Sequence, residues 1–275
     1  MAQIGLSMPS SVKTAFISKN STMKRDSYNA GINPLWRGYV VTSDHKVTKA
    51  YVKQIGNVNE LYKEVLCSLL GRAIGIDTPE PLIVKVEANH PDIPNNGEQL
   101  FFGTEDCESP SFSRFMVNNK SNEEQLLNYE KLHEIVSFDE LIANTDRHPG
   151  NILFDGVEYN FIDHGRTFPP DFAYNTPMTQ CDWGGNRLAE MVVDYQGHND
   201  VKTKVFMTKV NRFIRSKLSA EQINLLPESC RIDQDSLNIH HKNIQSFLMQ
   251  RLPILFHLVG FNVVIAENGQ LSLMR

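Results

Sequence analysis

The sequence of 275 residues predicts an α+β fold, with a β-rich N-terminal part followed by a mostly helical C-terminal part. Before Gly103, runs of strand-type residues alternate with short polar turns, and one amphipathic helix interrupts them. After Ser121, the apolar residues recur at helical spacing instead. We therefore expect two structural parts, residues 1–103 and residues 104–275.

The first 54 residues predict the start of a β meander. Residues 1–34 are polar and read as one or two strands around the loop Ser18–Thr22. Trp36–Thr42 and Val47–Gln54 are strand-like and flank a polar turn. Lys53 lies near the end of the second of these strands, in an otherwise apolar run.

One helix follows, over Asn57–Ile74. Its apolar residues recur every four positions, and Gly75 ends the periodic run. Glu60 and Glu64 fall on one side of this helix. Two further strands are predicted at Leu82–Val86 and Leu100–Gly103.

The C-terminal part is predicted to be helical apart from one central stretch. Ser121 and Glu124 have capping-box spacing, and the helix they begin continues, with a break, to Ile142. Ser219–Gln222 gives a second capping-box signal. Further helices are expected at 186–195, 201–218 and 236–258, with an irregular loop at 168–185 and Met191, Met207 and Met249 on apolar helix faces.

The central stretch, 138–165, contains a predicted hairpin. Asp155-Gly156 between two apolar runs is a strong hairpin signal. We expect a two-residue turn, in which Phe154 faces Val157 and Asn151 faces Asn160, so that Asn151 and Asp163 emerge close together. Asp146 precedes them in a polar loop that contains Pro149 and Gly150. Two hard oxygen ligands and a nearby carboxylate suit the handling of a magnesium-bound triphosphate.

The order of these residues resembles the catalytic segment of the HipA-like serine/threonine kinases and, in motif, that of the phosphatidylinositol 3-/4-kinases. The matching positions are Asn144, Asp146, Arg147, His148 and Asn151, followed by Asp163 and Gly165. The resemblance implies a bilobal protein-kinase-like fold, with an antiparallel N-lobe sheet and one helix in residues 1–103 and a helical C-lobe in residues 104–275.

The resemblance also implies roles for single residues, with ATP and Mg²⁺ as cofactors. Asp146 corresponds to the catalytic residue that orients the acceptor hydroxyl and takes its proton, and Asn151 and Asp163 correspond to the metal ligands. Lys53 corresponds to the lysine on the nucleotide phosphates and Glu64 to its partner, with Glu60 as the alternative. Phe101 and Phe102 lie in the segment against which adenine packs.

The match to the family has gaps. No GxGxxG precedes Lys53, so we expect backbone amides of the loop Ser18–Thr22, or of another turn, to cradle the phosphates. His148 is expected to brace its loop, and Arg147 is left open between a phosphate contact and solvent. The chain is shorter than HipA, so HipA's antitoxin and DNA partners are not carried over to it.

Composition and charge narrow the function classes. The chain is 41% hydrophobic and 21% charged, with a net charge of −5, whereas proteins that bind nucleic acid non-specifically usually carry a basic excess. No apolar run approaches the about 20 residues of a membrane-spanning helix, and no secretory signal is visible. Four widely spaced cysteines favour a reducing compartment over disulfides or zinc. We expect a cytoplasmic protein without a nucleic-acid partner.

Three functions remain in competition. The leading one is a kinase that phosphorylates a protein serine or threonine. The second keeps the chemistry but transfers to a phosphoinositide or a small molecule, and is less favoured because no basic amphipathic surface is evident. The third is a nucleotide-binding pseudokinase or interaction module. The presence of all five expected residues argues against it, namely Lys53, Glu64, Asp146, Asn151 and Asp163. The acceptor and the oligomeric state are left open.

Overall fold

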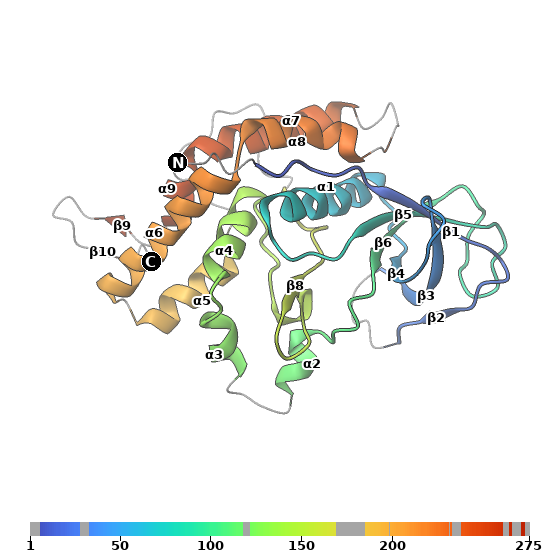
Figure 1. Cartoon of the computed structure of the whole chain (residues 1–275), viewed down its shortest axis with the longest axis horizontal. Helices are drawn as coiled ribbons and strands as arrows, with labels where there is room; N and C mark the ends of the chain where they lie inside the picture. Colours follow the sequence, from blue (N-terminus) through green and yellow to red (C-terminus); the bar gives the residue numbers. More distant parts are fainter. Residues whose placement is uncertain are drawn as a thin grey trace.

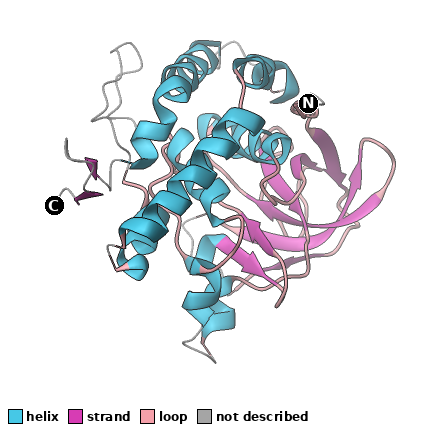
Figure 2. Ribbon diagram, turned by 60° about the vertical axis from the view of Figure 1, so that its left-hand side comes forward, coloured by secondary structure: helices cyan, strands magenta, loops and turns pink. Residues whose placement is uncertain are grey.

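The computed structural model describes residues 6–27, 33–117, 122–168, 185–197, 199–230, 232, 238–260, 264–265 and 271–272. Strands gather on one side of the molecule and helices on the other, as Figures 1 and 2 show. The predicted mixture of a β-rich N-terminal part and a helical C-terminal part is confirmed. The predicted boundary at residue 103 falls inside a strand, which continues to Glu105.

The N-terminal part is a six-stranded sheet. Its strands are β1 (Lys13–Ile17), β2 (Met23–Arg25), β3 (Leu35–Thr42), β4 (Val47–Lys53), β5 (Pro81–Val86) and β6 (Leu100–Glu105). The strand order is β1-β5-β6-β4-β3-β2, and β1 also pairs with β3, so that five strands close into a ring. The expected all-antiparallel sheet is wrong in one place, because β1 and β5 run parallel. A parallel pair needs a long crossover, which the intervening strands and helix provide.

The interior of this ring is a hydrophobic core of its own. Alternate residues of each strand point inward, as the two-residue period of a strand requires. The buried side chains of this inner cluster are Ala15, Ile17, Met23, Trp36, Val40, Ala50, Val52, Leu82, Val84, Val86, Ile93 and Phe101. Lys53 and Phe102, which are register partners on β4 and β6, belong to the opposite, outer face.

Helix α1 (Val58–Ile74) packs against the outer face of the ring. Asn57 caps its N-terminus, where the side-chain oxygen accepts a hydrogen bond from the Asn59 amide at 2.9 Å. Gly75 ends it at φ 92°, a left-handed conformation that favours glycine. Both ends agree with the sequence prediction. In Figure 1, α1 lies between the strands and the remaining helices.

The helical part contains α2 (Phe112–Met116), α3 (Asn122–Leu127), α4 (Leu132–Leu141), α5 (Arg187–Gln196), α6 (Asp200–Lys217), α7 (Ala220–Cys230), α8 (Asn238–Arg251) and α9 (Leu255–Val259). Among its described residues are also two short 3₁₀ turns, Pro149–Asn151 and Leu252–Ile254, a hairpin that is described below, and a small pair of strands, β9 (Val264–Ile265) and β10 (Leu271–Ser272). Helix α2 was not predicted. Among the described residues, no helix has the length and apolarity needed to cross a membrane.

Local sequence signals in this part are largely confirmed. The predicted break separates α3 from α4. At the start of α7, the Gln222 amide donates to Ser219 Oγ at 3.3 Å and the Ser219 amide donates to Gln222 Oε1 at 2.9 Å, which is a capping box. Met191 and Met207 pack against the core, whereas Met249 is 37% exposed, contrary to expectation. The capping residue Ser121 and the loop residues 169–184 lie outside the described residues.

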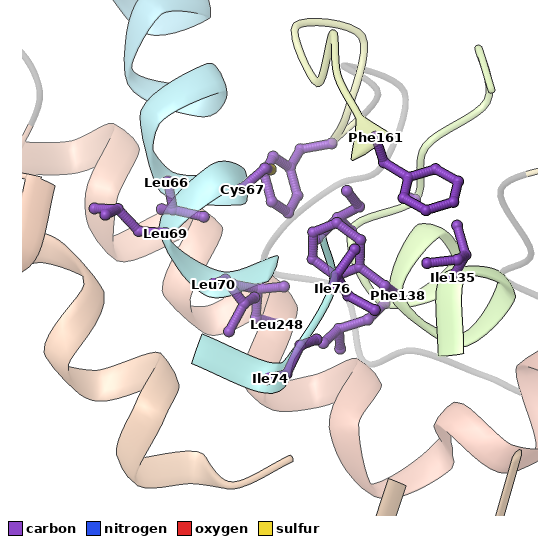
Figure 3. Close-up of a cluster of buried hydrophobic side chains, with 14 of the residues drawn as sticks. Leu66, Cys67, Leu69, Leu70, Ile74, Ile76, Ile135, Phe138, Phe161 and Leu248 are labelled. Atoms are coloured by element: carbon purple, nitrogen blue, oxygen red, sulfur yellow. The ribbon is translucent and has the colours of Figure 1, made fainter. Parts of the chain in front are cut away.

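A second hydrophobic core joins the sheet to the helices. It contains Ile83 and Phe102 from the outer face of the ring, and it continues through α1 to the helical part. Figure 3 shows its centre, where Leu70 of α1 lies beside Leu248 of α8, and Ile135 and Phe138 of α4 lie near Phe161. Because α1 is buried between the ring and the helical part and packs on both, it fixes the position of one part relative to the other.

The N-terminal strap, which we define as residues 6–12, runs along α7 before entering β1. The Val12 amide donates to the Ser229 carbonyl at 2.8 Å, and Gln222 Nε2 donates to the Ser7 carbonyl at 2.7 Å. Val12 is 2% exposed and belongs to the second core. The strap therefore connects the ring to α7 on the side away from the linker that follows β6.

Candidate active site

A cleft of about 1100 Å³ lies between the outer face of the ring and the helical part. Six of the seven side chains singled out from the sequence line it: Lys53, Glu64, Phe102, Asp146, Asn151 and Asp163. The seventh, Phe101, is fully buried inside the ring, because neighbouring residues on a strand point to opposite faces. The side chain of Phe101 therefore does not face the cleft, whereas that of Phe102 does. The expected packing of adenine against backbone groups of this strand stays a prediction for both residues.

The predicted hairpin forms the floor of the cleft, with strands β7 (Ile152–Phe154) and β8 (Tyr159–Phe161). Its predicted register is wrong, since Phe154 pairs with Tyr159 and not with Val157. The cause is the side chain of Asp155, whose Oδ1 accepts hydrogen bonds from the amides of Val157 and Glu158, at 2.7 and 2.8 Å, and closes a four-residue loop. Asn151 consequently lies opposite Ile162, whose amide donates to the Asn151 carbonyl at 3.1 Å. This register brings Asn151 closer to Asp163 than the predicted one.

The side chain of Asn151 is oriented by the loop that carries Asp146. Its Nδ2 donates to the Asp146 carbonyl at 2.9 Å, so the amide oxygen is directed away from that bond. The Asp146 amide in turn donates to Asn144 Oδ1 at 3.1 Å, and Gly150 donates to His148 Nδ1 at 3.0 Å. The latter bond agrees with the expectation that His148 braces its loop.

The side chain of Arg147 connects helix α4 to the two ends of the hairpin. Its guanidinium is fully buried and bonds both oxygens of Asp139 at 2.9 Å. Its Nη1 also donates to the carbonyls of Asn151 and Ile162, at 2.9 and 2.8 Å. Neither a phosphate contact nor a solvent position, the two alternatives open from the sequence, describes this residue. It fixes the backbone on both strands of the hairpin where the site residues emerge.

Lys53 links the ring, α1 and the end of the hairpin. Its Nζ lies 2.9 Å from Glu64 Oε1 and 3.0 Å from Asp163 Oδ1. Burial alone would lower the pKa of Lys53, but the two carboxylates outweigh it and raise that pKa above its usual value. Burial raises the pKa of Glu64 to about 7. Burial alone would raise the pKa of Asp163, but the charge of Lys53 and the hydrogen bonds to the carboxylate together outweigh it and lower that pKa.

The structure pairs Lys53 with Glu64 and gives Glu60 another partner. Glu60 Oε1 accepts a hydrogen bond from Asn33 Nδ2 at 2.9 Å, at the end of the connection between β2 and β3. Asp26, Asn33 and Leu35, which flank this connection, line the cleft. The loop Ser18–Thr22 does not, since its Lys19 amide is bonded to Glu87 on the other side of the ring. Of the two possibilities left open for a phosphate cradle, another turn is therefore the better placed.

Asp146 faces the cleft with its carboxylate about one third exposed, at 35%. Arg166, whose side chain is 66% exposed, approaches it with Nε 3.8 Å from Asp146 Oδ2. This distance is an ion pair and not a close hydrogen bond. An exposed cation thus lies beside the carboxylate that the sequence singled out as catalytic, and sequence reasoning had not identified it.

Asn151 and Asp163 fit a magnesium ion in the type of donor that they offer. The amide oxygen of Asn151 is not used by the Asp146 bond, and Lys53 contacts one oxygen of Asp163 and leaves the other. Magnesium prefers hard oxygen ligands and usually takes one or two carboxylates together with phosphate oxygens and water. One carboxylate and one amide oxygen in a cleft match that preference.

Comparisons with known proteins identify a family and a shared fold. Residues 43–247 match the family model described as HipA-like kinase. The fold is similar to that of the Helicobacter pylori proinflammatory kinase CtkA, with 12% sequence identity and a TM-score of 0.52 over 89% of this chain and 98% of that one. It is also similar to HipA of Shewanella oneidensis MR-1, solved with HipB and its operator DNA, with 11% identity and a TM-score of 0.50 over 86% of this chain and 66% of that one. No curated protein matches the chain. At these identities the solved structures show a shared fold.

Proposed function

Since the chain belongs to the HipA-like kinase family, we propose that it transfers the γ-phosphoryl group of ATP to a serine or threonine hydroxyl of a protein, with Mg²⁺ bound in the cleft. The observation that carries the proposal is the double contact of Lys53, with Glu64 on one side and Asp163 on the other. The two carboxylates lie 11 and 110 positions from Lys53 along the chain, and both contact its ammonium group. This convergence is what a triphosphate site needs.

In this proposal the ring with α1 is the N-lobe of a bilobal kinase and the helical part is its C-lobe. The adenine ring packs near Phe102, at the strand that leads into the linker after Glu105. Lys53 neutralises charge on the α- and β-phosphates, and Glu64 fixes its position. Glu64 is 1% exposed, so water screens its attraction to Lys53 only weakly.

Asp163 and Asn151 hold the metal in the proposed complex. The bound ion supplies positive charge to the phosphate oxygens during transfer. Arg147 keeps both ligands in place through the backbone carbonyls of Asn151 and Ile162, and through them it fixes the spacing of the two donors. No side chain forms a covalent intermediate in this scheme, since phosphoryl transfer depends mainly on positioning and charge.

Asp146 acts on the acceptor. Its carboxylate accepts a hydrogen bond from the serine or threonine hydroxyl, orients the oxygen toward the γ-phosphorus and takes the proton late in the transfer. Arg166 lies beside it and is exposed enough to turn from Asp146 toward the transferred group. The motif from Asn144 to Asn151, together with the family match, supports a protein as the acceptor.

The test is incubation of the purified chain with labelled ATP and Mg²⁺, alone and with a cell lysate, followed by mapping of phosphorylated residues. We expect labelled serine or threonine, and an Asp146→Asn variant slower by at least about 100-fold. Asp44→Asn, on the β3–β4 turn, is the matched control, because its carboxylate lies on an exposed turn bonded to Thr42.

Different outcomes separate the alternatives. Label on a lipid or small molecule but not on protein would retain the kinase and reject the protein acceptor. ATP binding without transfer, with wild type and Asp146→Asn alike, would favour a nucleotide-binding module. HipA in the solved complex assembles with HipB and DNA, whereas for this acidic chain we propose no nucleic-acid partner, which a filter-binding assay with duplex DNA would check.

A further inference from the structure

Four polar or sulfur-bearing side chains form one stripe on α1. They are Glu60, Lys63, Glu64 and Cys67, and we call them the α1 polar stripe. Their spacing of three, four and seven positions places them on a single helix face. That face meets the segment Asp163–Phe168, which follows the hairpin, and we call this the post-hairpin segment.

The stripe contacts the post-hairpin segment along its length. Glu64 Oε2 accepts from the His164 amide at 2.7 Å, and Cys67 Sγ lies 3.6 Å from Thr167 Oγ1. A Cβ added at Gly165 would come within 3.1 Å of Glu60 Oε1 and 3.3 Å of Glu64 Oε1. The helix and the segment therefore approach so closely that a side chain at Gly165 would require the carboxylates of Glu60 and Glu64 to shift.

Lys63 makes the contact at the far end of the segment. Its Nζ donates to the carbonyls of Thr167 and Phe168, at 2.9 and 3.2 Å. Both acceptors are backbone atoms, so the contact holds the path of the chain and not one particular side chain. The ammonium group is partly buried where it makes these bonds, and this burial lowers the pKa of Lys63.

The segment needs such a restraint because its backbone is strained at both ends. Asp163 has φ 59° and Phe168 has φ 49°, in the left-handed region that residues with side chains rarely adopt. Such a conformation is unfavourable for a residue with a side chain, so it persists where surrounding contacts fix it. Asp163 is held by Lys53, and at the other end the Phe168 amide donates to the Ile142 carbonyl at 3.1 Å while Lys63 takes the Phe168 carbonyl.

We infer that Lys63 is a positioning residue for the metal-binding carboxylate of Asp163, acting through the backbone of the post-hairpin segment. The inference rests on the proposed function for the role of Asp163. Lys63 itself touches neither the reacting atoms nor the metal ligands. Through Lys63, the position of α1 fixes the backbone that carries Asp163. The Lys53–Glu64 pair is a second connection between α1 and the ion site.

The experiment compares Lys63→Met with Arg72→Met. Arg72 lies on the same helix and also donates to a carbonyl, that of Thr78 at 2.8 Å, but it faces away from the cleft. Two quantities are measured: the Mg²⁺ concentration that gives half of the maximal transfer rate at saturating ATP, and amide hydrogen exchange of the peptide that contains residues 163–168 in the protein without ligands. Lys63→Arg, which keeps a donor of similar reach, is the rescue variant.

We expect Lys63→Met to raise the half-maximal Mg²⁺ concentration by about tenfold, with faster exchange in the 163–168 peptide. Arg72→Met should leave both quantities at the wild-type level even if it melts at a lower temperature, and Lys63→Arg should recover most of the loss.

Equal Mg²⁺ requirement and equal exchange in Lys63→Met and wild type would overturn the inference. Equal changes in Lys63→Met and Arg72→Met would do so as well, since they would report general stability. If wild type transfers no phosphoryl group, the proposed function fails, and the exchange comparison still decides whether Lys63 orders the segment.

Discussion

At the scale of single residues, the site depends on a buried arginine as much as on the residues that face the cleft. Arg147 makes four hydrogen bonds and spans Asp139 on α4 and the two strands of the hairpin. A lysine has one nitrogen and cannot reach four acceptors in this planar arrangement. Because Asp139 is 0% exposed, loss of the guanidinium leaves a buried carboxylate with only the hydrogen bond from Asn144 Nδ2.

Lysine keeps the charge but leaves some of these buried acceptors unsatisfied, so we expect Arg147→Lys to lower the free energy of unfolding by about 2–4 kcal/mol. Urea denaturation followed by circular dichroism measures this. The control is Arg72→Lys, whose salt bridge to Glu80 is partly exposed and for which we expect about 1 kcal/mol or less. A similar small loss in both variants would show that the buried pair contributes little to the fold.

Asn151→Asp tests whether the amide group of Asn151 orients the site. From ligand strength alone, this change would be expected to improve magnesium binding. Aspartate is the stronger magnesium ligand, but it cannot donate to the Asp146 carbonyl as Asn151 Nδ2 does. It would place an anion against that carbonyl and disturb the loop of the catalytic residue. We expect the maximal transfer rate to fall by about 10- to 100-fold.

Asn160→Asp is the control for this change, because Asn160 lies on the other strand of the same hairpin, opposite Leu153. It should leave the rate unchanged. A rate for Asn151→Asp equal to that of wild type, at any Mg²⁺ concentration, would contradict an orienting role for the Asn151 amide group.

The sequence identifies the residues that face the cleft more readily than those that support them. Asp146, Asn151 and Asp163 form an ordered motif, whereas an arginine in a polar loop is ordinarily solvated, so its sequence position gives no reason to expect burial. One signal was available. Asp139 and Glu140 interrupt the apolar face of α4, and an acidic residue on such a face usually has a cationic partner.

At the scale of elements, helix ends were predictable and strand pairing was not. Asn57, Gly75 and the Ser219 capping box act within one turn of helix, so nearby residues specify them. The register of the hairpin depended instead on one side chain, Asp155, and the parallel pairing of β1 with β5 joins segments far apart in the sequence. Alternation within a strand shows which residues share a face, but it does not show the direction or identity of the neighbouring strand.

The turn of the hairpin provides a prediction at this scale. Gly156 has φ 109°, outside the range that L-residues tolerate, and no atom lies within 4 Å of a Cβ placed there. Any cost of Gly156→Ala thus comes from the backbone and not from a clash. We expect a loss of about 1–3 kcal/mol in the free energy of unfolding.

Gly56→Ala is the matched control, since a Cβ there also meets no atom within 4 Å and the residue has no positive φ. We expect it to be neutral or slightly stabilising, by about 0.5 kcal/mol. Denaturation curves of the two alanine variants and wild type make the comparison. Equal stability of the two variants would mean that the turn relaxes into another conformation at no cost.

At the scale of the whole molecule, the ring and the helical part share one core. Ile83 and Phe102 of the ring and the buried face of α1 belong to the same cluster as Phe138 and Leu248. The N-terminal strap adds a connection to α7, and its Val12 side chain lies in that same cluster. A molecule joined in this way is expected to unfold in one step, although its two parts are distinct in architecture.

This expectation is tested by Val12→Ala, which removes two methyl groups from the shared core. We expect the free energy of unfolding to fall by about 1–3 kcal/mol. Trp36 is buried inside the ring, so its fluorescence reports the sheet, whereas far-ultraviolet circular dichroism reports mainly the helices. A Trp183→Phe background isolates the Trp36 signal. Val201→Ala on α6, at a position that is 70% exposed, is the control and should be nearly neutral.

If the strap and α1 make the two parts one cooperative unit, both probes will shift together by the same amount in Val12→Ala. Should the fluorescence transition move while the circular dichroism transition stays in place, the ring would be unfolding independently. The Lys53–Glu64–Asp163 contact would then depend on the docking of two separate domains. Coincident curves would instead mean that a substitution in the strap, far from the cleft, weakens the site only by lowering the stability of the entire fold.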